Sequence, residues 1–138
     1  MSRSGYSDDL DSWDLVRWRG AVASAIRGKR GQALLRDLAA ALDAMPEKRL
    51  IARQLEEDGE VCALGALGRV RGIDMSKIDP EERDQVAKAF DIAEALAAEI
   101  VYHNDECGWT GYPGETPENR WVRMRAWVAE KLAKESER

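Results

Sequence analysis

The sequence predicts a mainly helical α+β fold, with about six helices in one compact domain and at most one short β-hairpin. Apolar residues recur at spacings of three and four along most of the chain, which is the pattern of amphipathic helices. An Asp-Gly dipeptide between two short segments is the signal for a hairpin turn. The length of 138 residues fits a single domain, which we expect at residues 11–135 after a flexible N-terminal arm at residues 1–10.

The first two helices are predicted to form an αα-hairpin. Asp11 or Ser12 caps a helix whose apolar stripe consists of Leu15, Trp18, Val22 and Ile26. The segment Arg27–Gly31 contains two glycines, which favour a tight turn with left-handed backbone positions. A second helix is predicted over Gln32–Met45, because Pro46 bars its continuation.

A hairpin and a core helix are predicted next. Asp58-Gly59 favours a two-residue turn between strands within Arg49–Glu57 and Glu60–Cys62. The run Ala63–Gly68 is small and apolar throughout, so it predicts a buried helix, which Gly72 closes.

Capping patterns mark the starts of the last three helices. Asp79-Pro80-Glu81-Glu82 places a cap, a proline and a capping-box glutamate in order, and predicts a helix from there to Phe90. Asp91-Ile92-Ala93-Glu94 repeats the box and predicts a helix that ends near Asn104. Thr116-Pro117-Glu118 predicts the start of the final helix.

The composition excludes several classes of protein. With 44% hydrophobic and 34% charged residues, the chain is too apolar for a disordered protein and too evenly charged for a membrane protein. The uncharged run Val61–Gly68 is far shorter than the ~20 residues that cross a bilayer. The polar start also lacks the apolar region of a signal peptide. We therefore expect a cytoplasmic protein with no membrane partner.

Basic residues gather early in the chain. The segment Leu15–Arg36 carries all its charge as Lys and Arg, in a chain of net charge -5. Its central turn is a candidate nucleic-acid or phosphate site, because backbone N–H groups and cations converge there; it consists of Arg27, Gly28, Lys29, Arg30 and Gly31. The glycine spacing is similar to the GXXG loop of KH domains, which clamps a nucleic-acid backbone. The alternative is a plain solvated turn.

Cys62 is the candidate nucleophile for an enzyme. At a helix N-terminus its thiol could act with His103 as base and Asn104 or Asp105 as orienting group. The apolar neighbours of Cys62 favour instead a small buried side chain, and Asn104-Asp105 fits a left-handed helix cap. The spacing of Cys62, His103 and Cys107 matches no zinc pattern. We therefore predict no catalytic residue, no metal site and no cofactor.

The glycine-rich loop from Asp105 to Glu115 carries two large aromatic residues, Trp109 and Tyr112. Rings on such a loop are hard to bury, and exposed aromatic side chains on loops are typical anchors for a partner. The alternative is that Trp109 folds back onto the core. We predict that Trp109 and Tyr112 form a site for a protein partner.

Several runs of the sequence together resemble small bacteriophage and prophage proteins of unknown function. These runs are Arg27–Gln32, Asp58–Leu67 with its VCALGAL segment, Asn104-Asp105 and Thr116–Trp121. The likeness covers most of residues 10–130. It implies a setting in the cytoplasm of a host bacterium and transfers no catalytic residue.

These features predict a non-enzymatic binding protein, and the resemblance implies a phage accessory factor that engages a host or phage macromolecule. Two alternatives stay open. The first is a nucleic-acid or phosphate binder that uses the Arg27–Gly31 turn. The second is a cysteine-dependent hydrolase or transferase centred on Cys62.

Overall fold

The computed structural model describes residues 12–105 and 115–136. The α-helices in this part of the chain are α1 (Ser12–Arg27), α2 (Lys29–Ala44), α3 (Ala63–Arg71), α4 (Arg83–Phe90), α5 (Glu94–Asp105) and α6 (Pro117–Ser136). A short 3-10 helix, η1 (Met75–Lys77), and one hairpin of β1 (Glu56–Glu57) and β2 (Glu60–Val61) complete the described elements. The mainly helical α+β fold is therefore confirmed, and the expected arm at residues 1–10 lies outside the described residues.

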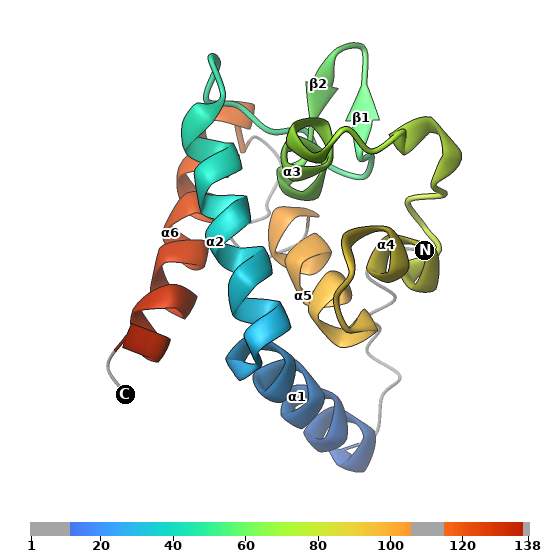
Figure 1. The fold of residues 1–138 in the computed structure, drawn as a ribbon, viewed down its shortest axis with the longest axis vertical. Coiled ribbons are helices and arrows are strands. Elements are labelled where there is room, and N and C mark those ends of the chain that lie inside the picture. The colour runs from blue at the N-terminus through green and yellow to red at the C-terminus, as the bar shows by residue number, and fades with distance from the viewer. Residues whose placement is uncertain (1–11, 106–114, 137–138) are drawn as a thin grey trace.

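Helix α5 lies at the centre of the fold and contacts α1, α3, α4 and α6 (Figure 1). Helices α2 and α6 pack side by side along one flank, and the hairpin lies beside α3 at one end. The largest side chains that are almost completely buried come from five helices and the segment after α2: Leu34, Leu35, Leu38, Leu42, Leu50, Leu64, Leu67, Phe90, Leu96, Ile100 and Met124. One continuous core thus joins α2 to α6.

Gly28 alone separates α1 from α2, so the turn is shorter than predicted. Its backbone is extended, with φ -68° and ψ 158°, and Gly31 lies inside α2. The prediction of left-handed glycines here is therefore wrong. Gly31 meets a different need, because a Cβ at this position would lie 1.9 Å from the carbonyl oxygen of Ala25. Only a glycine lets the first turn of α2 pack this closely on the last turn of α1.

The predicted apolar stripe of α1 is buried over part of its length. Val22 is buried, and Trp18 and Ile26 are partly buried. The Arg83 guanidinium of α4 lies 5.4 Å from the centre of the Trp18 ring. Leu15, by contrast, is 47% exposed, because the first turns of α1 extend beyond the body of the fold (Figure 1).

The hairpin turn forms at the predicted dipeptide. Asp58 and Gly59 both have positive φ, 53° and 81°, as a two-residue turn with strand-matched twist requires. The ladder pairs Glu56 with Val61 and Glu57 with Glu60. The first strand is shorter than predicted, and Arg53 before it has a φ of 73°, which is incompatible with extended backbone.

Two of the three predicted late helix starts are displaced. Helix α4 begins at Arg83, and Asp79 instead closes a turn in which its Oδ1 accepts from the Glu81 N–H at 3.0 Å. Asp91 ends α4 in a left-handed conformation, and α5 begins at Glu94. The third prediction is confirmed, because Thr116 Oγ1 accepts from the Asn119 N–H at 3.0 Å and caps α6.

The close approach of α1 and α2 predicts opposite effects for two glycine substitutions. Gly31→Ala forces its methyl group onto the Ala25 carbonyl, so we expect the free energy of unfolding to fall by about 1–3 kcal/mol or more. The control Gly20→Ala lies in the same helix pair with nothing within 4 Å of the new Cβ. Because alanine has a higher helix propensity than glycine, Gly20→Ala should raise the free energy of unfolding by about 0.5–1 kcal/mol. Urea denaturation measures both, and equal effects would contradict this packing.

Candidate functional site

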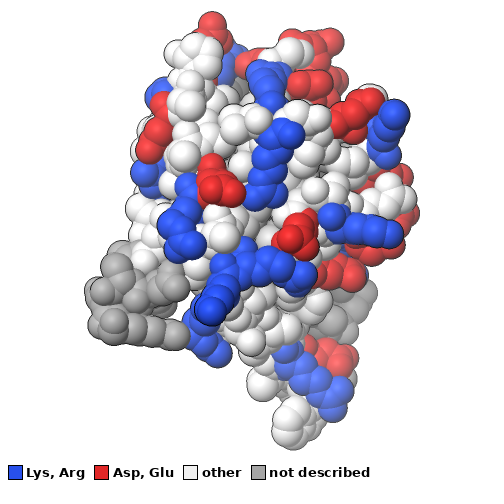
Figure 2. All heavy atoms as spheres, viewed as in Figure 1, with Lys and Arg blue, Asp and Glu red and all other residues white. Residues whose placement is uncertain are grey.

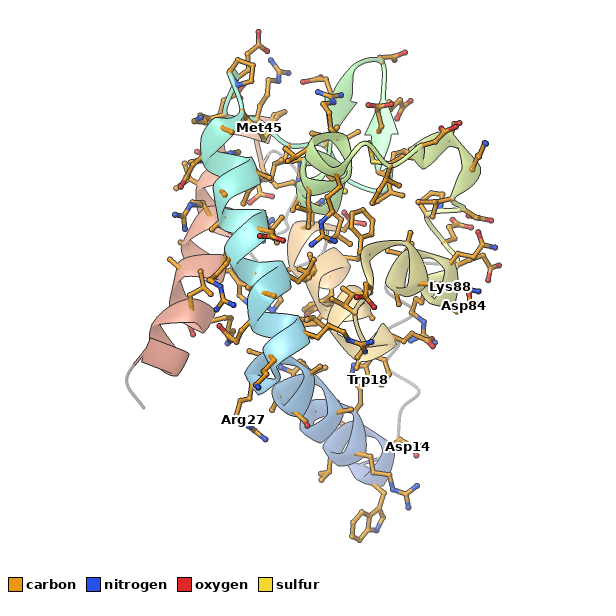
Figure 3. All side chains as sticks on the ribbon, viewed as in Figure 1. Asp14, Trp18, Arg27, Met45, Asp84 and Lys88 are labelled. Atoms are coloured by element: carbon orange, nitrogen blue, oxygen red, sulfur yellow. The ribbon has the colours of Figure 1, made fainter. Side chains whose placement is uncertain are left out.

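Three exposed cations lie at the junction of α1 and α2, and a fourth, Arg17, lies earlier on the exposed side of α1. Arg17 and Arg27 belong to α1, and Lys29 and Arg30 form the first turn of α2. We call these four residues the basic surface. Figure 2 shows Lys and Arg side chains across the middle of the viewed face, with some Asp and Glu side chains among them and more toward its edges. Figure 3 shows Arg27 pointing away from the junction.

The basic surface has little acidic compensation. Arg30 lies 3.5 Å from the carboxylate of Asp91, but both side chains are largely exposed, so this pair is weak. Within residues 12–105 and 115–136, no carboxylate forms an ion pair with Arg17, Arg27 or Lys29. Arginines elsewhere mostly contact an acid; those that do are Arg49, Arg69, Arg71, Arg83, Arg120, Arg123 and Arg125. The positive charge at the α1–α2 junction therefore remains directed outward.

The start of α2 adds to this positive potential. Its N-cap, Gly28, offers no side-chain oxygen, and its first turn contains no acid. The first turn instead carries Lys29 and Arg30, next to the positive end of the helix dipole. Cations at this end are unfavourable, whereas an anion is stabilised by the dipole and the exposed N–H groups. The arrangement therefore favours binding of an external anion.

The structure separates the five residues predicted for the basic turn. Arg27, Gly28, Lys29 and Arg30 are exposed, whereas Gly31 is buried against α1. Because Lys29 to Gly31 are helical, the two glycines do not form a loop between helices. The similarity to a KH loop therefore fails in geometry, while the exposed cations remain available.

Arg19 of the same basic segment has a separate role in the fold. Its guanidinium donates to both carboxylate oxygens of Glu99, at 3.1 and 3.2 Å, and this carboxylate is 2% exposed. His103 Nε2 lies 3.2 Å from the same carboxylate, and the His103 ring stacks on Trp127 at 4.7 Å between centroids. The ion pair between Arg19 and Glu99 thus links α1 to α5.

Cys62 is the N-cap residue of α3. Its Sγ accepts from the Gly65 N–H at 3.4 Å, and the residue is 1% exposed. A helix-capping thiol in the core matches the alternative of a small buried side chain. A substrate cannot reach this sulfur in the folded structure.

Asn104 has a structural role that the sequence did not indicate. Its Oδ1 accepts from the Ala63 N–H at 3.1 Å, at the start of α3. Its Nδ2 donates to the Ile51 carbonyl at 2.9 Å and to Asp105 Oδ1 at 2.8 Å. The predicted left-handed cap is wrong, because both Asn104 and Asp105 are helical. The described hydrogen bonds join the Asn104 side chain to the backbone around Cys62 and give it no role in orienting His103.

Two arginines of α6 hold the last turn of α5. Arg120 donates to the carbonyls of Asn104, at 3.0 Å, and Leu50, at 3.1 Å. Arg123 donates to the carbonyl of His103 and makes a two-point contact with Glu115 at 2.7 and 2.8 Å. This hydrogen bonding by Arg123 holds the pKa of the Glu115 carboxyl below its ordinary value. The arginines of α6 therefore act within the fold.

An open groove of about 400 Å³ lies between the end of α2, the hairpin and α3. Its apolar lining includes Met45, Val61 and Val70, and Val70 is 66% exposed. The charged side chains at its edge are already paired, Arg49 with Glu60 and Arg69 with Glu56. Sequence analysis missed this groove because its lining comes from three separate segments.

The remaining predicted residues lie outside the described part of the chain. These are the partner site at Trp109 and Tyr112, and the second cysteine, Cys107. Among the described residues, no group of three His, Cys, Asp or Glu side chains could hold a metal ion. A search of the same residues finds no helix with the length and apolarity to cross a membrane.

The hydrogen bonds of Asn104 predict a large stability loss on truncation. Asn104→Ala leaves the buried Ala63 N–H and the Ile51 carbonyl without this partner, and we expect the free energy of unfolding to fall by about 2–5 kcal/mol. Asn119→Ala, at an exposed position in α6, is the control and should change it by less than about 0.5 kcal/mol. Chemical denaturation compares the two. A loss for Asn104→Ala as small as that of the control would exclude this role.

The burial of Cys62 predicts a thiol that is inert in the native protein. We expect iodoacetamide to leave the Cys62 peptide unmodified at neutral pH and to alkylate it after guanidinium unfolding. Cys62→Ser should lower the free energy of unfolding by about 1–3 kcal/mol, because it buries a hydroxyl group. Peptide mass mapping distinguishes Cys62 from Cys107. Rapid alkylation of native Cys62 would support the enzyme alternative.

Comparison with known proteins identifies no family for this chain. No protein-family model, no curated protein and no solved structure matches it. Its function is therefore inferred from the contacts, charge and exposure of its own residues.

Proposed function

We propose that this protein is a non-enzymatic binding protein that engages nucleic acid through the basic surface. One observation carries the proposal: exposed cations without an acidic partner among the described residues meet an uncapped, acid-free helix start, in a chain of net charge -5. The charge that binds a phosphate backbone need only be local. The rest of the acidic protein would repel the same backbone, and this would orient the complex.

The electrostatics of α2 favour a ligand over a purely structural role. Lys29 and Arg30 at a helix N-terminus each oppose the helix dipole, by about 0.3–1 kcal/mol in the free protein. A bound phosphate removes this conflict, because it neutralises the cations and accepts from the N–H groups of the first turn. Residues that disfavour the free fold and favour a complex are typical of binding sites.

The setting that we propose is a phage or prophage protein acting in the cytoplasm of its bacterial host. The support for this setting is the resemblance of the VCALGAL segment and Asn104-Asp105 to such proteins. In that setting, the macromolecule engaged would be phage or host nucleic acid. The enzyme alternative has less support, because the thiol of Cys62 is buried and caps α3.

A protein partner is the second candidate. The groove between α2 and α3 supports it, since an apolar lining with exposed Val70 suits a side chain from another protein. Trp109 and Tyr112 stay predicted anchors for the same kind of partner. The basic surface has the stronger case, because Arg17, Arg27 and Lys29 have no acidic partner among the described residues and Arg30 has only a weak exposed pair, while the charges around the groove are paired.

The salt dependence of binding tests the basic surface. We expect labelled DNA or RNA to bind at ~50 mM salt and to dissociate steeply as salt rises. The double variant Lys29→Ala, Arg30→Ala should weaken binding and lower the log–log salt slope by about two, because each cation contributes about one. The same variant should unfold no more easily than the original protein, since it removes charges that oppose the helix dipole.

A matched control removes two positive charges elsewhere. Lys77→Ala, Lys88→Ala changes the net charge equally, in η1 and α4, and should leave most of the salt slope intact. Fluorescence anisotropy measures all three proteins. Absence of binding to any single- or double-stranded nucleic acid at ~50 mM salt would refute the proposal. Equal losses for the two double variants would show that only overall charge matters.

A further inference from the structure

One face of α1 is exposed to solvent from Trp13 to Arg27. Its members follow the 3.6-residue repeat and are Trp13, Val16, Arg17, Gly20, Ser24 and Arg27. The opposite face holds Val22 and the partly buried Trp18 and Ile26. We call the six exposed residues the α1 face.

Trp13 is the unusual member of the α1 face. Its side chain is 72% exposed, whereas Trp127 is buried and Trp18 and Trp121 are partly buried against the fold. Folding therefore gains little from this ring. Val16 on the next turn is 62% exposed and extends the apolar patch.

The α1 face places this ring in line with positive charge. Arg17 lies one turn after Trp13, and Arg27 ends the same face, two residues before the exposed Lys29. Between the two arginines the face carries only Gly20 and Ser24, and a Cβ on Gly20 would meet nothing within 4 Å. The α1 face thus has an aromatic ring near one end and cations at the other, with only small side chains between Arg17 and Arg27.

We propose that the α1 face binds single-stranded nucleic acid, with the Trp13 ring stacked on a base and Arg17, Arg27 and Lys29 contacting phosphates. This inference rests on the proposed function and names its ligand more narrowly. The distance along α1 from Trp13 to Arg27 is about 21 Å at ~1.5 Å per residue, which accommodates several nucleotides. Aromatic rings beside a positively charged track are the common way to bind single strands without reading their sequence.

The chemistry of the α1 face favours a single strand over other polyanionic partners. In a duplex the bases are already stacked on each other, so the Trp13 ring finds no free base face. A membrane surface requires a continuous apolar side on the helix. Here the residues that follow Trp13 and Val16 on the exposed face are Arg17, Gly20 and Ser24, and the main apolar side of α1 packs on the fold.

An abasic oligonucleotide separates base stacking from phosphate binding. Fluorescence anisotropy compares a labelled oligothymidine with an abasic strand of the same length, which has the same phosphates and no bases. We expect the unaltered protein to prefer oligothymidine by roughly tenfold, the order of one aromatic stack on a base. Trp13→Ala should abolish this preference and retain binding to the abasic strand, and Trp13→Phe should retain part of the preference.

The control Val16→Ala changes the neighbouring exposed side chain and should keep the preference for bases. Thermal unfolding should be the same for all variants, because both side chains are largely exposed. Equal affinity for oligothymidine and the abasic strand would overturn the inference and leave the proposed function standing. Tighter binding to a duplex, or to anionic lipid vesicles, than to oligothymidine would also overturn it. Failure of every nucleic acid to bind would refute the proposed function itself.

Discussion

The fold depends on one buried amide, the side chain of Asn104, which is 1% exposed. Its Oδ1 accepts a hydrogen bond from the Ala63 N–H, the first of α3. Its Nδ2 donates to the carbonyl of Ile51, in the segment that leads into the hairpin. The backbone carbonyl of Asn104 accepts a hydrogen bond from the Arg120 side chain of α6. Because a buried polar group without a partner destabilises the fold, the loss of any one of these bonds would be costly. Four segments that are distant in sequence are thereby held in one arrangement at the end of α5.

This arrangement brings the VCALGAL segment and Asn104 into direct contact. Cys62 caps α3 because its sulfur accepts from the Gly65 N–H, and Asn104 Oδ1 accepts from the Ala63 N–H of the same helix start. Position 65 requires glycine so that α3 can pack on the segment before β1, because a Cβ there would lie 1.9 Å from the Leu55 carbonyl oxygen. Packing or hydrogen bonding therefore determines the residue type at each of these positions. The pattern therefore describes how the fold is held, and a binding role belongs to residues whose properties the fold does not need.

Local signals were predictable from sequence, and long-range contacts were not. Asp58-Gly59 and Thr116-Pro117 act within a few residues, so the turn and the start of α6 were predicted correctly. Gly31 resembled a turn residue, but its requirement comes from Ala25 across the helix pair. The basic residues of the candidate site were visible as a charge cluster, whereas only the structure separates Arg19, which is bound to Glu99, from Arg17, which has no acidic partner among the described residues. The exposure of Trp13 also depends on how far α1 extends beyond the body.

The protein uses its arginines in two different ways. In the body of the fold they bind carboxylates and helix carbonyls, as Arg123 does with Glu115 and the end of α5. Along the exposed side of α1 and the start of α2, Arg17, Arg27 and Lys29 meet no carboxylate among the described residues. Paired charges largely cancel at a distance, so Arg27, Lys29 and the dipole of α2 add positive potential near the α1–α2 junction. An acidic protein whose exposed cations lie along one side of α1 and at the start of α2, in line with the exposed Trp13, would meet a negatively charged ligand in one orientation, and the proposed binding of nucleic acid rests on this arrangement.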